Sequence, residues 1–257
     1  MIDLNKAKNV FFEYIKNYDE TESNISVKKY HSLRVMENAL AIAKDLKLSQ
    51  EDIELAGLIG LLHDTARFEQ WKRFNNFSDK KTGFDHGDEG AKILSENDFL
   101  RSYISSSEYD GLIIRAVRNH NKFKIEDGLN ERELLHSKII RDADKLDIFM
   151  ESIEKMYLTP ESEKAIENSI VSDSYYSQFM NEIQIKRVPD QTPLDMIISY
   201  VAFIYDINFD YSIREIVKEK YVDRMIDVFD LKLDKAKKQV EEIKIVGNKY
   251  LEKRLGK

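Results

Sequence analysis

Residues 53–64 read IELAGLIGLLHD, and this stretch, almost wholly apolar until it ends in His63 and Asp64, decides the fold. Ser49 and Asp52 lie just before it in the spacing of a capping box, which predicts the start of a helix. A helix that is apolar all round is normally buried on every side. We therefore expect a core helix over 53–63 that carries a histidine and a carboxylate at its C-terminal end.

The rest of the chain also favours helices. Its 257 residues include only 9 Gly and 3 Pro. Because these two residues are frequent in the turns of loop-rich and β-rich folds, their scarcity predicts long helices with short connections. Apolar residues recur at helical spacing over 4–18, 26–46, 86–97, 109–120, 131–156, 161–186, 194–207, 212–229 and 232–255. The aromatic-rich residues 67–84 are predicted to form a loop or short helix. The clearest break, 188–193, is short for a linker between domains, so the sequence predicts an all-α fold in a single domain over 1–257.

The composition and net charge of the chain exclude some classes of binding partner. With a net charge of −7 and a pI near 5.4, the chain lacks the basic surface of a general nucleic-acid-binding protein. A small anionic substrate stays compatible, because bound divalent cations reverse the local field. The absence of cysteine leaves nitrogen and oxygen as metal ligands. We identify no signal peptide and no membrane-spanning run of about 20 apolar residues, so we expect a cytoplasmic protein without membrane association.

Four of the five histidines lie near predicted helix ends or early in a helix, beside small or polar neighbours: His31, His63, His86 and His120. The side chains of His63 and Asp64 point about 100° apart on a helix, so both can reach one ion beside the helix end. Neutral imidazole suits Zn, Fe, Mn, Co or Ni, and a carboxylate adds negative charge. The two oxygens of Asp64 could also bridge two ions about 3.5–4 Å apart, with His86 and His120 holding the second ion.

A further acid, Asp142, lies beside Ile139 and Ile140 in the predicted helix over 131–156. An acid among apolar residues costs several kcal/mol unless it is paired or bound to a metal. We therefore predict that Asp142 is a metal ligand. The fifth histidine, His136, lies six positions earlier and about 120° away around the helix, so we predict that it is not a ligand.

In this order, these residues resemble the HD-domain metal phosphohydrolases, a family named for its adjacent His-Asp pair. The family order is a His, then a His-Asp pair, then a distant Asp, and it corresponds here to His31, His63-Asp64 and Asp142. His86 and His120 fall in the interval where members with two ions carry two further histidines. The pattern is therefore similar to the binuclear subset, which includes iron- and manganese-dependent phosphodiesterases and nucleotide hydrolases. The resemblance covers roughly residues 28–149.

The resemblance implies an HD-like helical bundle over about 26–156, followed by a C-terminal helical extension over about 157–257. It also implies that a metal-bound hydroxide attacks a phosphate ester or anhydride of a small phosphorylated substrate, expected to be a nucleotide. One or two divalent transition-metal ions are expected; iron or manganese is the first choice, and zinc, nickel, cobalt and magnesium fit the same ligands. Besides Asp64, we predict that Lys145 and Arg67 take part in catalysis by stabilising charge on the phosphate.

Several alternatives stay open at the level of the sequence. Lys145 lies three residues after Asp142 on the same helix face, so it could instead form a salt bridge that orients an acidic ligand. A mononuclear centre would use only His31, His63, Asp64 and Asp142. A regulatory nucleotide-binding module without catalysis and a di-iron oxygenase are alternatives of other functional classes. The sequence leaves the substrate, the metal and the oligomeric state open.

Overall fold

The computed structural model describes residues 2–96 and 98–256, and these residues contain helices but no strand. The predicted all-α fold is therefore confirmed. The described residues form two compact units, one ending at Asp144 and the other starting at Lys145. The division falls inside α9 (Glu131–Ile153), a few turns before residue 156, where the sequence led us to expect the HD-like bundle to pass into a C-terminal extension. The single domain over 1–257 stays a prediction. Helical periodicity shows that α9 continues, but it does not show which neighbours its successive turns contact.

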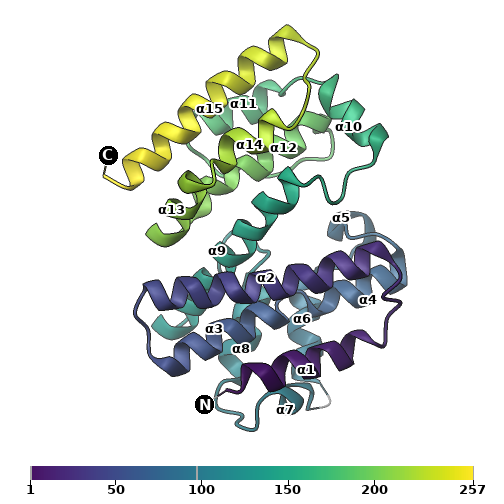
Figure 1. Ribbon diagram of the computed structural model, residues 1–257, viewed down its shortest axis with the longest axis vertical. Coiled ribbons are helices and arrows are strands. Elements are labelled where there is room, and N and C mark those ends of the chain that lie inside the picture. The colour runs from purple at the N-terminus through teal and green to yellow at the C-terminus, as the bar shows by residue number, and fades with distance from the viewer. Residues whose placement is uncertain (1, 97, 257) are drawn as a thin grey trace. The chain divides into compact units, whose positions relative to one another are not determined.

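The first unit is built around α3 (Gln50–Leu62), in which residues 54–62 are all buried. Ser49 caps this helix as predicted, because its Oγ accepts a hydrogen bond from the backbone amide of Asp52 at 3.1 Å. The other helices of this unit (Figure 1) are α1 (Leu4–Ile15), α2 (Ser23–Asp45), α4 (Thr65–Phe74), α5 (Asp79–Thr82), α6 (His86–Ser95), α7 (Phe99–Tyr103), α8 (Asp110–Asn119) and the part of α9 up to Asp144.

Close packing of α2 along α3 brings the first two histidines together (Figure 1). Gly60 permits this approach, because a Cβ atom at this position would lie only 2.8 Å from the Cα atom of Met36. His31 of α2 then lies beside His63, the residue that ends α3, with their ring centroids 5.1 Å apart. A glycine in the core helix is therefore needed for the geometry of the histidine pair.

The second pair of histidines depends on the contact between α6 and α8. Gly87 lies in the first turn of α6, and a Cβ atom there would lie 2.8 Å from the carbonyl oxygen of Arg118. A larger residue would push the start of α6 away from the end of α8. With glycine in place, the rings of His86 and His120 lie 4.8 Å apart, centroid to centroid.

Some helix boundaries differ from those predicted. The helix predicted over 26–46 begins at Ser23, and the one predicted over 161–186 is two helices, α10 (Pro160–Glu167) and α11 (Asp173–Met180). The aromatic-rich residues 67–84 contain most of α4 and the single turn of α5. Helix ends are the least certain part of any prediction from periodicity, because local capping groups decide them.

The second unit is also helical. Besides α10 and α11, it contains α12 (Pro193–Val201), the 3₁₀ helix η1 (Ala202–Asp206), α13 (Asp210–Lys218), α14 (Tyr221–Asp227) and α15 (Asp234–Arg254). Thr159 and Thr192 form capping boxes just before the prolines that begin α10 and α12. In the described part of the chain, none of the helices combines enough length with enough hydropathy to traverse a lipid bilayer.

Candidate metal centre

Five of the six predicted metal ligands come together in the first unit, although they are up to 89 positions apart in the chain. His31 belongs to α2, His63 ends α3 and Asp64 precedes α4, while His86 begins α6 and His120 follows α8. All five side chains are buried. The groups that could hold a metal ion, among the described residues, include His31 with His63 and Asp64, and Asp64 with His86 and His120.

Asp64 lies between the two pairs of histidines. Its Oδ2 atom is 3.4 Å from Nε2 of His31 and 3.6 Å from Nε2 of His63. Its Oδ1 atom is 3.5 Å from Nε2 of His120 and 3.7 Å from Nε2 of His86. Each carboxylate oxygen therefore faces one histidine pair, which is the arrangement needed for a carboxylate that bridges two ions.

The acid that α9 supplies to this cluster is Asp144, not Asp142. Oδ1 of Asp144 lies 3.2 Å from Nε2 of His31 and 3.6 Å from Nε2 of His63. Asp142 is also buried, but it belongs to none of the possible metal-binding groups among the described residues. Side chains two positions apart on an α-helix point about 200° apart, so only one of the two acids can face the histidines. Both acids stand in the same apolar helix, and the sequence pattern did not distinguish them.

The hydrogen bonds on the far side of three imidazole rings leave Nε2 available to a metal. Nδ1 of His63 donates to the carbonyl oxygen of Gly60 at 2.8 Å, and Nδ1 of His120 donates to that of Val117 at 2.6 Å. Nδ1 of His86 contacts the carboxylate of Asp79. Carbonyl and carboxylate oxygens only accept, so Nδ1 carries the proton in each ring and Nε2 presents a lone pair.

The unprotonated Nε2 atoms and carboxylate oxygens of the cluster can coordinate a metal ion, but they cannot form hydrogen bonds with one another. Nε2 of His120 is buried and has no hydrogen-bond partner among the described residues. Nε2 of His63 carries no proton in the tautomer above, yet it faces Nε2 of His31 at 3.1 Å and carboxylate oxygens of Asp64 and Asp144. Metal ions placed among these atoms would give each of them a partner, and buried polar atoms without partners are otherwise rare.

Burial and neighbouring charges set the protonation states that a metal requires. Burial lowers the pKa of His63, and burial together with the nearby Arg67 lowers the pKa of His86 to about 4, so both rings are neutral at pH 7. Burial opposes ionisation of Asp64, but the charge of Lys28 holds the pKa of its carboxyl well below the usual value. Burial also opposes ionisation of Asp144, and its hydrogen bond with His31 holds the pKa of this carboxyl well below its usual value. Neutral imidazoles and ionised carboxylates are the forms that bind divalent ions.

A buried lysine that the sequence analysis missed also reaches the cluster. Nζ of Lys28 lies 2.9 Å from Oδ2 of Asp64, and the lysine side chain is only 10% exposed. It also lies over the ring of Phe77, 5.9 Å from the centroid. Lys28 precedes His31 by three positions on α2, so the signal in the sequence was a cation one helical turn from a predicted ligand.

The two predicted catalytic cations have partners of their own. Nη1 of Arg67 donates to the carbonyl oxygen of Phe77 at 2.6 Å and to Oδ1 of Asp79 at 2.9 Å. Nζ of Lys145 forms an ion pair with Oδ2 of Asp206 at 2.8 Å, within the second unit. One salt bridge of Lys145 is thus made with an acid of η1. The predicted catalytic roles of both cations stay predictions.

His136 lies apart from the cluster, in the position expected of a structural residue. Its Nε2 atom is 3.1 Å from Oδ1 of Asp52, at the start of α3. The same carboxylate oxygen accepts from Nε of Arg132 at 2.7 Å. Among the described residues, His136 belongs to none of the groups that could hold a metal ion.

Comparison with known families agrees with this geometry. Residues 29–148 match the HD domain family, and the matched segment contains all the clustered histidines together with Asp64 and Asp144. Comparisons with curated proteins and with solved structures gave no match. HD domains are all-α and define a superfamily of metal-dependent phosphohydrolases, in keeping with the helices and the His/Asp cluster found here. Residues 29–148 of this chain are therefore identified as an HD domain.

Proposed function

We propose that this protein hydrolyses a phosphate ester or anhydride of a small molecule, a nucleotide in our proposal, with the help of two divalent transition-metal ions. The observation that carries the proposal is the placement of Asp64, which turns one carboxylate oxygen to His31 and His63 and the other to His86 and His120. A carboxylate shared between two groups of imidazoles is typical of a two-metal site.

The ligands divide into two sets around the shared carboxylate. His31, His63 and Asp64 would hold the first ion together with Asp144, whose Oδ1 atom lies within 3.6 Å of Nε2 of both histidines. Asp64, His86 and His120 would hold the second ion. Nitrogen and oxygen ligands of this kind suit iron and manganese as well as zinc, nickel and cobalt. When bound, such ions supply a nucleophile at neutral pH by lowering the pKa of coordinated water, and they neutralise charge on the phosphate.

The residues of the chain contribute position and charge. The apolar helix α3 and the packing of α2 fix His63 and His31, so little reorganisation is needed when the site is loaded. Two carboxylates do not cancel the charge of two divalent ions, and Lys28 adds a further positive charge beside Asp64. The loaded site is therefore positive, which favours a phosphate group over a neutral substrate.

A test of the function combines metal analysis with a screen for phosphate release. We expect anaerobically purified protein to contain close to two ions per chain and to release phosphate from at least one nucleotide in the screen. Removal of the ions by a chelator should abolish the release, and addition of Mn²⁺ or Fe²⁺ should restore it. Loaded protein that binds a nucleotide tightly but hydrolyses none would favour a regulatory module and contradict the proposal.

Loss of one histidine from the second set is expected to remove one ion and leave the other. We predict that His86→Ala and His120→Ala each lower the metal content from two ions to one per chain, because His31, His63 and Asp144 are untouched. His136→Ala is the matched control, since His136 is buried beside a carboxylate but lies outside the cluster. Unchanged metal content in both His86→Ala and His120→Ala would rule out the second ion.

A further inference from the structure

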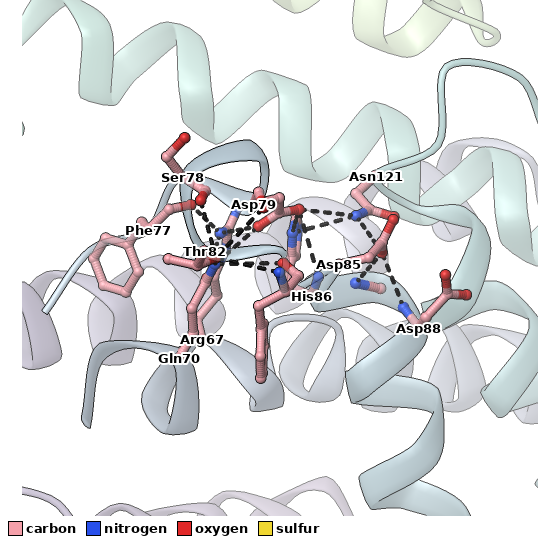
Figure 2. A network of polar contacts seen from close by, with 12 residues as sticks. Arg67, Gln70, Phe77, Ser78, Asp79, Thr82, Asp85, His86, Asp88 and Asn121 are labelled. Atoms are coloured by element: carbon pink, nitrogen blue, oxygen red, sulfur yellow. Dashed lines mark hydrogen bonds and ion pairs between the residues drawn. The ribbon is translucent and has the colours of Figure 1, made fainter. Parts of the chain in front are cut away.

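Asp79, the first residue of α5, occupies the centre of a polar network beside the second set of ligands (Figure 2). Its Oδ2 atom contacts Nδ1 of His86. Its Oδ1 atom accepts hydrogen bonds from Nη1 of Arg67 at 2.9 Å and from Nε2 of Gln70 at 3.0 Å. Oδ2 of Asp79 is thus the contact of His86, and Oδ1 is held by hydrogen bonds from two side chains of α4.

The two donors from α4 are themselves held in place. Gln70 is fully buried, and its Nε2 atom also lies 3.2 Å from Oγ1 of Thr82. Nη1 of Arg67 also donates to the carbonyl oxygen of Phe77 and to Oε1 of Gln70, each at 2.6 Å. The carboxylate of Asp79 therefore cannot turn without breaking several part-buried hydrogen bonds, each worth about 0.5–1.5 kcal/mol net and more where a charged group takes part.

The place of His86 in the chain explains why it needs such a partner. His63 and His120 lie at the ends of helices, and each donates its Nδ1 proton to a carbonyl three residues earlier in its own helix. His86 begins α6, so no preceding turn of that helix offers a carbonyl. The carboxylate of Asp79, seven residues earlier, takes the position that a helix carbonyl has in the other two cases.

The same contact fixes the tautomer of His86. A carboxylate cannot donate, so Nδ1 of His86 carries the proton and Nε2 presents its lone pair toward Oδ1 of Asp64, 3.7 Å away. The amide of Asn121 lies 3.2 Å from the same Nδ1 atom, but its hydrogens are taken by Oδ1 of Asp85 at 2.9 Å and Oδ2 of Asp79 at 3.4 Å. Neither hydrogen of this amide is left to donate to Nδ1, so the amide does not require a lone pair on that atom.

We propose that Asp79 is a positioning residue for the second metal site, which orients His86 and holds it in the Nδ1–H tautomer. Arg67 supports Asp79 in this role, besides its own ion pair with Asp64, in which Nε lies 3.7 Å from Oδ1. This inference rests on the proposed two-metal function, because it assigns a partner to a ligand of the second ion. Outer partners of this kind change metal affinity by about 10–100-fold when removed. It also gives Arg67 a role other than the predicted contact with substrate phosphate.

The test compares two substitutions that remove the same charge from neighbouring positions. We expect Asp79→Asn to weaken binding of the second Mn²⁺ ion by about 10–100-fold and to leave the first ion unchanged. Asp85→Asn is the matched control: Asp85 caps α6 through the amides of Gly87 and Asp88 but does not contact the ring of His86, and asparagine caps helices equally well. Asp85→Asn should therefore keep both affinities close to those of the wild type.

A metal-free measurement separates this inference from the proposed function. In nitrogen NMR spectra of the metal-free protein, we expect His86 to show the Nδ1–H tautomer in the wild type and in Asp85→Asn. In Asp79→Ala we expect a mixture that includes the Nε2–H form. A wild-type tautomer in Asp79→Ala, or equal loss of the second ion in Asp79→Asn and Asp85→Asn, would overturn the role of Asp79. A wild type that binds fewer than two ions would overturn the two-metal function instead, while the NMR result would still decide whether Asp79 orients His86.

Discussion

The Asp64→Ala variant is expected to lose both ions and to release phosphate at least about 100-fold more slowly than the wild type. Asp64 is the only described residue that belongs both to the group with His31 and His63 and to the group with His86 and His120. Removal of its carboxylate therefore takes one ligand from each ion. Metal content measured by mass spectrometry, together with the rate of phosphate release, checks this prediction.

Stability must be separated from chemistry in this variant. Asp64→Ala also leaves Lys28 buried without its carboxylate, and the loss of one partner from a buried ion pair costs about 3–5 kcal/mol. Asp64→Asn keeps the shape of the side chain and should fold more stably, so its thermal unfolding and metal content are measured in parallel. Asp52→Asn is a control outside the cluster, because Asp52 also pairs with a histidine. An Asp64→Asn variant with two ions and wild-type activity would contradict the bridging role.

The two acids of α9 are expected to behave differently when each is replaced by asparagine. Asp144→Asn should lose the first ion and most of the activity, because Oδ1 of Asp144 lies within 3.6 Å of Nε2 of both His31 and His63. Loss of a direct ligand should reduce metal affinity by more than the 10–100-fold typical of an outer partner. Asp142→Asn should keep both ions, because Asp142 belongs to none of the described metal-binding groups.

The comparison of these two variants has its own control for folding. Asp142 is buried and the side chain of Asp144 is only 15% exposed, so either substitution could lower stability, and thermal unfolding of both is measured before metal content is compared. If Asp142→Asn lost an ion while Asp144→Asn kept two, the assignment of the ligand to Asp144 would be wrong, and the sequence-based choice of Asp142 would be restored.

The parts of the site that depend on one helix were predictable from the sequence. The apolar run over 53–62 predicted a buried helix, and the structure buries residues 54–62 as expected. A buried helix that ends in His63-Asp64 must present these side chains at the core. The placement of His63 and Asp64 could therefore be predicted directly from the sequence. His31, His86 and His120 were recognisable from their order along the chain.

The parts that depend on contacts between distant segments were not predictable. The choice between Asp142 and Asp144 depends on which face of α9 meets α2 and α3, and both acids stand among apolar residues in the sequence. Two partners of Arg67 come from the segment between α4 and α6: Phe77, and Asp79 at the start of α5. The division at Asp144 also depends on tertiary contacts that helical periodicity does not encode.

Anomalous X-ray diffraction from crystals of the manganese-loaded protein tests the two-metal centre most directly. We predict two anomalous peaks about 3.5–4 Å apart, with one oxygen of Asp64 directed to each. The first peak should lie among His31, His63 and Asp144, and the second beside His86 and His120. A single peak, or peaks that lie away from Asp64, would contradict a metal pair bridged by this carboxylate.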